Sequence, residues 1–238
     1  MNNICDIHSH IIPFVDDGAS DFNMAIDILK TAYKQGVRNI VCSSHNGFNT
    51  NEYFRNFEIL KNKVKNENID INLYSGCEIY CSECSIFNIK KGLNDGSIPT
   101  INNTKHILVE FNPYEKASNI LEYCYILRLC GYIPIIAHTE RHFGFYENYE
   151  YIHALQKIGC LFQINAYSIC DCSDENIRNF SRNLLRNHII TFVGSDVHRT
   201  THRSYMIKNG IDYIYKYFDV EYADNICFKN AKNMLNIN

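Results

Sequence analysis

Histidine and carboxylate side chains recur along the chain in short motifs of the kind that bind metal ions. Two of these motifs, His8-Ser9-His10 and Asp196-Val197-His198, place side chains two residues apart, and in a strand such residues share a face and can bind one ion. A set of imidazoles and carboxylates without cysteine suits manganese, iron or zinc in a catalytic site more than a structural zinc. In chain order, the candidate ligands are His8, His10, Asp17, His45, Glu78, Glu110, His138, Asp196 and His198.

Most of the candidate ligands stand at the ends of predicted strands. Short segments rich in Ile and Val predict buried parallel strands, at 4–8, 39–44, 71–77, 107–111, 133–137, 161–165 and 189–194. Helices are predicted between and after them, from Asp21 to Gly36 and at 52–67, 84–91, 117–130, 147–158, 174–187 and 222–235. The alternation predicts an α/β fold, either a closed or nearly closed barrel of seven βα units or an open doubly wound sheet.

The carboxyl ends of parallel strands lie on one face of a barrel or sheet, so these distant side chains are expected to converge on one pocket. Burying so many ionisable groups without compensation would cost several kcal/mol for each charge. Divalent ions would compensate those charges. The pattern therefore favours a metal centre over a structural network of polar side chains.

Length and composition indicate one soluble domain over residues 1–238. A formal charge of −3 and a pI of about 6.4 leave no basic field for nucleic acid. Residues 1–7 lack the features of a signal peptide, and the apolar runs are too short to span a membrane. We therefore expect a cytoplasmic protein that neither inserts into membranes nor binds nucleic acid.

The chain contains 11 cysteines, which we interpret mainly as buried apolar residues in a reducing compartment. Cys77, Cys81 and Cys84 have the spacing of a radical-SAM iron–sulfur motif, but Glu83 replaces the aromatic residue that usually precedes the last cysteine. The interpretation as ordinary thiols is therefore preferred for these three residues as well.

Taken together, the motifs HxH, DG, SH, GxE, xEF, AHxER and SDxH resemble those of the PHP (polymerase and histidinol phosphatase) superfamily. Within it, the segments CDIHSHIIPFVDDGAS, IPIIAHTER and VGSDVHRTTHR are similar to the bacterial metal-dependent protein-tyrosine phosphatases of capsule and exopolysaccharide operons. The resemblance covers essentially the whole chain and implies a distorted (β/α)7 TIM-like barrel. The chain departs from the pattern at Asn46-Gly47-Phe48, where relatives often have a second histidine or a basic residue.

The resemblance also implies three divalent metal ions. Mn²⁺ is the preferred identity, with iron or zinc as alternatives. Arg141 and Arg203 match two phosphate-binding arginines of the family. Carried over by position, the predicted ligands are His8, His10, Glu78 and Asp196 for the first ion, Glu78, Glu110 and His138 for the second, and Asp17, His45 and His198 for the third.

The function implied by the resemblance is hydrolysis of phosphotyrosine on an autophosphorylated bacterial tyrosine kinase that regulates capsular or exopolysaccharide synthesis. The alternatives are a histidinol-phosphate phosphatase or another small-molecule phosphoesterase of the superfamily, and a metal-bound regulatory module without catalysis. The aromatic residues Phe14, Phe48, Tyr80 and Phe143 are candidates for stacking on an aromatic substrate, or simply pack the rim of the barrel.

Overall fold

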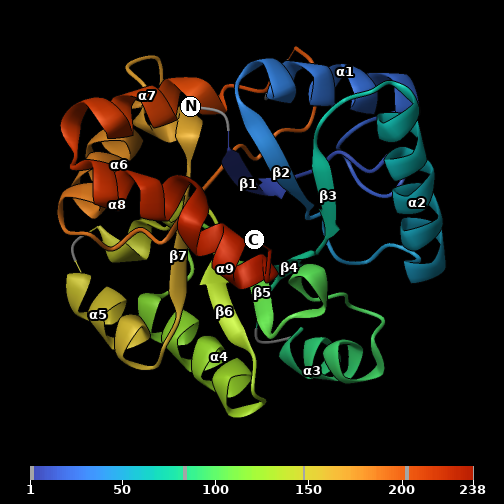
Figure 1. Cartoon of the computed structure of the whole chain (residues 1–238). Helices are drawn as coiled ribbons and strands as arrows, with labels where there is room; N and C mark the ends of the chain where they lie inside the picture. The colour runs from blue at the N-terminus through green and yellow to red at the C-terminus, as the bar shows by residue number, and fades with distance from the viewer. Residues whose placement is uncertain (1–2, 83–84, 147, 202–203, 238) are drawn as a thin grey trace.

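Eight short strands form the centre of the computed structural model, which describes residues 3–82, 85–146, 148–201 and 204–237 (Figure 1). Neighbouring strands pair in parallel, in the order β1-β2-β3 for one group and β4-β5-β6-β7-β8 for the other. The strands are β1 (Ile4–Ser9), β2 (Val37–Cys42), β3 (Asn72–Ser75), β4 (Glu78–Tyr80), β5 (His106–Glu110), β6 (Ile133–Ile136), β7 (Leu161–Asn165) and β8 (Phe192–Gly194).

Backbone contacts between the two groups of strands close them into a barrel. On one side the chain after β8 pairs with β1, where the amide of Asp196 donates to the carbonyl of His8 at 2.8 Å. On the other side the chain after β2 pairs with β4, where the amide of Asn46 donates to the carbonyl of Glu78 at 2.9 Å. The predicted α/β class and distorted barrel are confirmed. The open doubly wound sheet is excluded, because its first and last strands would not be neighbours.

The single strand predicted at 71–77 is in fact interrupted, and β3 and β4 lie on either side of Gly76. The hydroxyl of Tyr53, a fully buried residue of the second helix, accepts a hydrogen bond from the Gly76 amide at 2.9 Å and donates to the Gly76 carbonyl at 2.8 Å. A Cβ atom on Gly76 would lie 2.7 Å from Val41 Cγ1, so a larger residue does not fit there. After this break Glu78 begins a new strand, which pairs with β5.

Helices cover the outside of the barrel and alternate with its strands (Figure 1). The predicted start of the first helix is confirmed, because the Asp21 side chain accepts hydrogen bonds from the amides of Asn23 and Met24. The helices are α1 (Phe22–Lys34), α2 (Thr50–Asn66), α3 (Ile86–Asp95), α4 (Ala117–Leu129), α5 (Tyr149–Lys157), α6 (Glu175–Arg186), α7 (Ile207–Tyr217), α8 (Val220–Asp224) and α9 (Asn230–Leu235). A π-helical turn, Asn225–Lys229, joins α8 to α9.

The sequence pattern did not predict helix α7. Its buried residues Ile207, Ile211 and Ile214 follow the helical period, but Gly210 lies among them and weakens the helical signal. The structure gives the reason for this glycine: a Cβ atom there would lie 2.4 Å from the carbonyl oxygen of Ala166. Helix α7 thus packs directly against the backbone of the segment that follows β7.

The C-terminal helix closes one end of the barrel. On α9, Met234 and Leu235 are buried in a cluster with inward-facing residues such as Cys5 of β1 and Phe192 of β8. Residues at the beginnings of the strands, among them Asn39, lie beside this helix. The carboxyl ends of the strands are therefore left at the opposite face of the barrel, as the predicted site requires.

Most cysteines contribute to the core, as expected. Those that the structure describes are all free thiols, and apart from Cys130 and Cys172 they are buried. Among the helices in the described ranges, none combines the length and the apolar character that crossing a membrane requires.

Candidate metal centre

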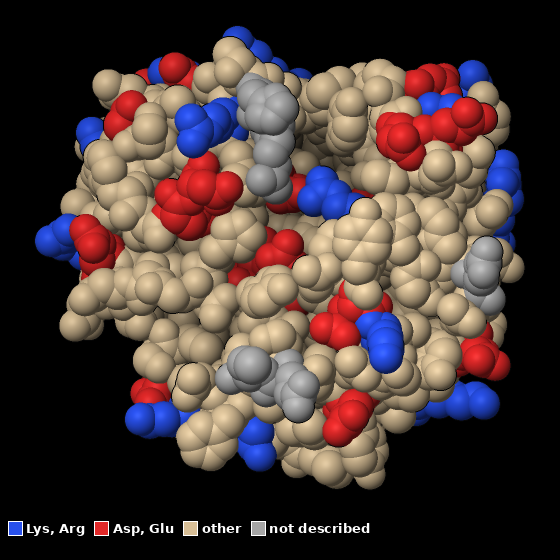
Figure 2. Space-filling model, turned by 180° about the vertical axis from the view of Figure 1, so that it is seen from behind, with Lys and Arg blue, Asp and Glu red and all other residues tan. Residues whose placement is uncertain are grey.

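The nine predicted ligands converge at the carboxyl ends of the strands. They come from β1, β4, β5 and the segments that follow β1, β2, β6 and β8. Seen from the side opposite to Figure 1, acidic side chains surround a hollow near the middle of the surface (Figure 2). Three overlapping groups could each hold a metal ion: His8, His10 and Glu78; His45, Glu78 and Glu110; and His10, Asp17, His45 and His198.

The first group has the spacing of ligands around a single ion. His8 Nε2 and His10 Nε2 are 3.2 Å apart, and each lies within 3.2 Å of Glu78 Oε2. Asp196 Oδ1 lies 3.6 Å and 3.7 Å from the same two nitrogens. Ligands at about 2.1 Å from one ion are separated by roughly 3.0–3.4 Å in octahedral or tetrahedral geometry. The four side chains therefore fit the set predicted for the first ion.

The second group shares Glu78 with the first, and His138 lies beside it. While Glu78 Oε2 faces His8 and His10, Glu78 Oε1 lies 3.0 Å from His138 Nε2. Glu110 Oε1 lies 3.5 Å from the same His138 nitrogen. The two oxygens of one carboxylate thus point to two neighbouring sets of ligands, which is the arrangement expected of a bridging ligand.

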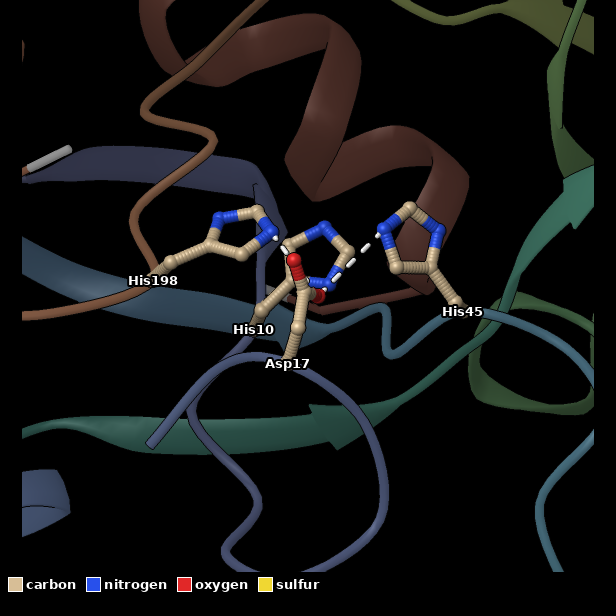
Figure 3. A group of neighbouring side chains, drawn as sticks. All are labelled: His10, Asp17, His45 and His198. Atoms are coloured by element: carbon tan, nitrogen blue, oxygen red, sulfur yellow. Dashed lines mark ion pairs between the residues drawn. The ribbon is translucent and has the colours of Figure 1, made fainter. Parts of the chain in front are cut away.

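The third group lies nearer to solvent, and Figure 3 shows its four side chains. Asp17 Oδ1 is 3.4 Å from His198 Nε2 and 3.6 Å from His45 Nε2 (Figure 3). The His10 ring stacks on that of His198 with centroids 3.9 Å apart. His45 belongs to the second group as well, since its Nδ1 lies 3.2 Å from Glu78 Oε2 and 3.7 Å from Glu110 Oε2. The family pattern assigned His45 to the third ion alone, whereas its two nitrogens face different groups.

Charges inside the site depend strongly on one another. Burial alone would lower the pKa of His10, but Asp16 and Glu78 outweigh it and raise the pKa to about 10. Burial would likewise lower the pKa of His138, but Glu110 and Glu78 outweigh it and raise the pKa to about 9. Burial also disfavours the charged form of Glu78, yet the surrounding imidazoles hold its pKa well below the ordinary value. Divalent ions would supply this positive charge in place of the imidazole protons.

Two of the candidate ligands have unusual backbone conformations. His138 has φ of 29°, and Asp196 has φ of 54°. Left-handed conformations cost a residue other than glycine about 1–3 kcal/mol and cluster at functional sites. Each residue lies two positions after the end of a strand, His138 after β6 and Asp196 after β8. In these conformations His138 lies beside Glu78, and Asp196 lies beside His8.

Several residues that hold the ligands in place were not among the predicted site residues. Asp16 accepts a hydrogen bond from His10 Nδ1 at 2.8 Å and another from the His45 amide at 3.0 Å. Burial would raise the pKa of Asp16, but its bonds with His10 lower it to about 2. Its position next to Asp17 was the available signal, since one acidic residue of such a pair can bind an ion while the other orients a ligand.

Strand β7 contributes a second set of supporting residues. Gln163 Oε1 accepts hydrogen bonds from His8 Nδ1 at 3.1 Å and from the His138 amide at 2.7 Å. Asn165 Nδ2 donates to Asp196 Oδ2 at 2.9 Å. Both side chains are buried, and their spacing of two residues places them on the inner face of the strand. Two buried polar residues at that spacing in an otherwise apolar strand were the signal that could have revealed them.

A buried carboxylate lies below the first group. Asp6 Oδ1 accepts hydrogen bonds from the amides of His8 at 3.1 Å and Ser195 at 2.9 Å, and Asp6 Oδ2 accepts one from the Tyr205 hydroxyl at 2.6 Å. Burial raises the pKa of Asp6, and these hydrogen bonds oppose that rise. Asp6 thus ties β1 to the segment after β8 at the seam where the barrel closes.

Replacement of Gln163 by leucine is expected to weaken Mn²⁺ binding by about 10- to 100-fold, the usual effect of removing the partner that orients a ligating histidine. The physical reason is that His8 Nδ1 would lose the acceptor that fixes its ring orientation. Titration calorimetry on chelator-stripped protein measures the affinity. Gln156→Leu on the exposed face of α5 is the matched control. Equal affinities in the two variants would contradict the proposed role of Gln163.

Of the two predicted phosphate-binding arginines, Arg141 lies beside the first group. Arg141 Nη1 is 3.0 Å from Asp196 Oδ2, and about a third of the side chain (36 %) is exposed. Arg203 lies outside the residues that the structure describes. Arg141 therefore remains close enough to the candidate ligands to contact an anion that they also bind.

A parallel barrel whose strand ends gather several groups of imidazoles and carboxylates is an architecture typical of metal-dependent hydrolases. The sequence model of the family described as "Capsular polysaccharide synthesis, CpsB/CapC" matches residues 4–236. The chain belongs to this CpsB/CapC family. The resemblance inferred from the motifs is therefore confirmed.

Individual relatives agree with the family match. CapC of Staphylococcus aureus is 34% identical over 210 residues, which are 85% of this chain and 80% of CapC. The tyrosine-protein phosphatase YwqE of Bacillus subtilis is 32% identical over 223 residues, 91% of this chain and 85% of YwqE. Among solved structures, those of YwqE and of CpsB from Streptococcus pneumoniae are described as unique metal-dependent tyrosine phosphatases. The matching chain has a TM-score of 0.89 and 28% identity, and the match covers 98% of this chain and 94% of the other.

Proposed function

We propose that this protein is a metal-dependent protein-tyrosine phosphatase, a phosphoric monoester hydrolase that acts on phosphotyrosine. The observation that carries the proposal is the position of Glu78, whose two oxygens face two separate groups of candidate ligands close to Arg141. The family of the chain and the tyrosine phosphatases among its relatives support this activity over histidinol-phosphate hydrolysis. The substrate within this proposal is an autophosphorylated bacterial tyrosine kinase that regulates capsular or exopolysaccharide synthesis.

We propose that the site binds three divalent ions, with Mn²⁺ as the preferred metal. The first would be held by His8, His10, Glu78 and Asp196, the second by Glu78, Glu110 and His138, and the third by Asp17, His45 and His198. The spacing within each group supports this assignment. We treat residues 1–238 as one catalytic domain and place it in the cytoplasm, where the free thiols of the described cysteines would persist.

Metal ions, Arg141 and the leaving group each have a separate role in the proposed reaction. Divalent ions, when bound by the candidate ligands, would lower the pKa of a water molecule and polarise phosphate oxygens. Arg141 is placed to bind a phosphate oxygen by a charge-assisted hydrogen bond, and Asp196 holds its guanidinium at 3.0 Å. A phenolate, whose conjugate acid has a pKa of about 10, leaves more readily than an alkoxide. Phosphotyrosine hydrolysis therefore needs little help from a general acid.

Phosphate release from a phosphotyrosine peptide and from histidinol phosphate, measured side by side, tests the proposal. Chelator-stripped protein is expected to be inactive, and Mn²⁺ is expected to restore activity with a preference for the peptide. A preference for histidinol phosphate would assign the protein to the small-molecule phosphatases. Inactivity toward both substrates, with Mn²⁺ bound, would favour a regulatory module without catalysis.

A further inference from the structure

A cavity of about 320 Å³ opens directly beside the predicted first ion. It shares Asp196 and Arg141 with the candidate metal centre but extends away from it, toward the segment after β7 and the start of α7. The described residues that line it are Arg141, Asn165, Tyr167, Ser195, Asp196, Thr201, Ser204 and Met206. We propose that this cavity is the subsite for the aromatic ring of an aryl phosphate, with Tyr167 and Met206 as its apolar walls. The inference rests on the proposed phosphatase function and adds the residues that select the substrate.

The orientation of Asp196 determines where a bound substrate would extend. Its Oδ1 faces His8 and His10, at 3.6 Å and 3.7 Å from their Nε2 atoms. Its Oδ2 is held by Arg141 Nη1 at 3.0 Å and by Asn165 Nδ2 at 2.9 Å. The guanidinium therefore lies on the cavity side of the carboxylate. A phosphate that contacts both the candidate ligands and Arg141 would direct its ester group into the cavity.

Tyr167 is exposed but firmly held. The residue is 43% exposed, and its hydroxyl donates to the carbonyl of Cys172 at 3.1 Å. The next residue, Ser168, is buried and donates to Glu140 Oε1 at 2.6 Å. On the other side, Ala166 is packed against Gly210 of α7. An aromatic ring fixed in this way offers a stacking surface without a large loss of conformational entropy on binding.

The second apolar wall of the cavity is Met206, which precedes the first residue of α7 and is partly buried. A thioether adapts its shape to a flat ring and makes favourable contacts with it. The hydroxyl-bearing residues of the lining, Ser195, Thr201 and Ser204, leave the remaining wall polar. The cavity thus has two apolar walls and otherwise polar ones. A phenyl ester, which has a flat apolar ring and a charged phosphate, fits such a lining better than an alkyl ester does.

This subsite differs from the one expected from the sequence. Phe14, Phe48, Tyr80 and Phe143 were the candidates for stacking, and none of them is among the described residues that line the cavity. Three of them are exposed large side chains elsewhere on the surface, Phe14 at 59%, Tyr80 at 41% and Phe143 at 41%. Phe48 instead stacks on the buried ring of Tyr53 with centroids 4.6 Å apart.

The inference is tested by comparing phenyl phosphate with propyl phosphate as substrates of the Mn²⁺-loaded enzyme. Tyr167→Ala is expected to lower the ratio of kcat/KM for the phenyl ester to that for the propyl ester by roughly five- to tenfold, the usual range for loss of an aromatic contact. Met206→Ala is expected to lower the same ratio about threefold. Tyr167→Phe should lower the ratio much less than Tyr167→Ala, because it retains the ring and loses only the hydrogen bond to the Cys172 carbonyl. Tyr125→Ala, at an exposed tyrosine of α4, is the matched control.

Direct binding provides a second readout. Calorimetry should show that Tyr167→Ala weakens binding of phenylphosphonate by a similar factor and leaves the affinity for methylphosphonate unchanged. An unchanged ester ratio in both the Tyr167→Ala and Met206→Ala variants would overturn the inference, and so would an equal loss for both esters. If the Tyr167→Ala variant does not fold, the ester ratio of the Met206→Ala variant tests the subsite by itself. Wild-type protein that hydrolyses neither ester would contradict the proposed function, and the phosphonate affinities alone would then decide the subsite.

Discussion

Replacement of Glu78 by glutamine is expected to lower kcat/KM for a phosphotyrosine peptide by about 10³-fold or more, since a metal ion that stabilises the transition state contributes several kcal/mol. The substitution keeps the shape of the side chain but removes its charge. Glu78 Oε2 lies within 3.2 Å of His8, His10 and His45 nitrogens, and Oε1 lies 3.0 Å from His138 Nε2. The amide would therefore weaken two groups of candidate ligands at once.

Elemental analysis of the Mn²⁺-loaded protein, together with the peptide assay, checks this expectation. The Glu78→Gln variant should bind fewer ions than the wild type, in parallel with the loss of activity. Glu150→Gln, on the exposed face of α5, is the matched control and should change neither quantity. Full metal content and activity in the Glu78→Gln variant would show that Glu78 is not a shared ligand.

Replacement of Arg141 by alanine is expected to lower kcat/KM for the same peptide by roughly 10²- to 10³-fold, the usual effect of removing one preorganised donor to the transition state. The guanidinium lies 3.0 Å from Asp196 Oδ2 and borders the cavity beside the candidate metal centre. Unlike Glu78, Arg141 is not a candidate ligand. Its loss should therefore reduce activity while the Mn²⁺ content stays close to that of the wild type.

Inhibition by inorganic phosphate separates this role from a general loss of structure. The inhibition constant should rise in the Arg141→Ala variant, and Arg141→Lys should recover only part of the affinity because lysine cannot form a bidentate contact. Arg186→Ala, at an exposed position of α6, serves as the control. Unchanged phosphate inhibition and turnover in the Arg141→Ala variant would remove Arg141 from the phosphate-binding site.

The sequence by itself determined the class of fold and which residues are candidate ligands. Alternating apolar strands and helices predict parallel β-structure, and the carboxyl ends of such strands share one face. In motifs such as His8-Ser9-His10 the spacing alone predicts that both side chains lie on one face, because residues two apart in a strand point the same way. These are local relations, so they could be predicted from one chain without coordinates.

Only the tertiary structure decided how the side chains are shared and supported. The break at Gly76, which depends on the distant Tyr53 hydroxyl, brings Glu78 between two groups of ligands. Closure of the barrel brings Gln163 to His8, and packing of α7 against the segment after β7 brings Met206 to the same cavity as Tyr167. Each of these contacts joins residues from distant segments. Their distances depend on how whole strands and helices meet, and no local pattern in the sequence specifies that.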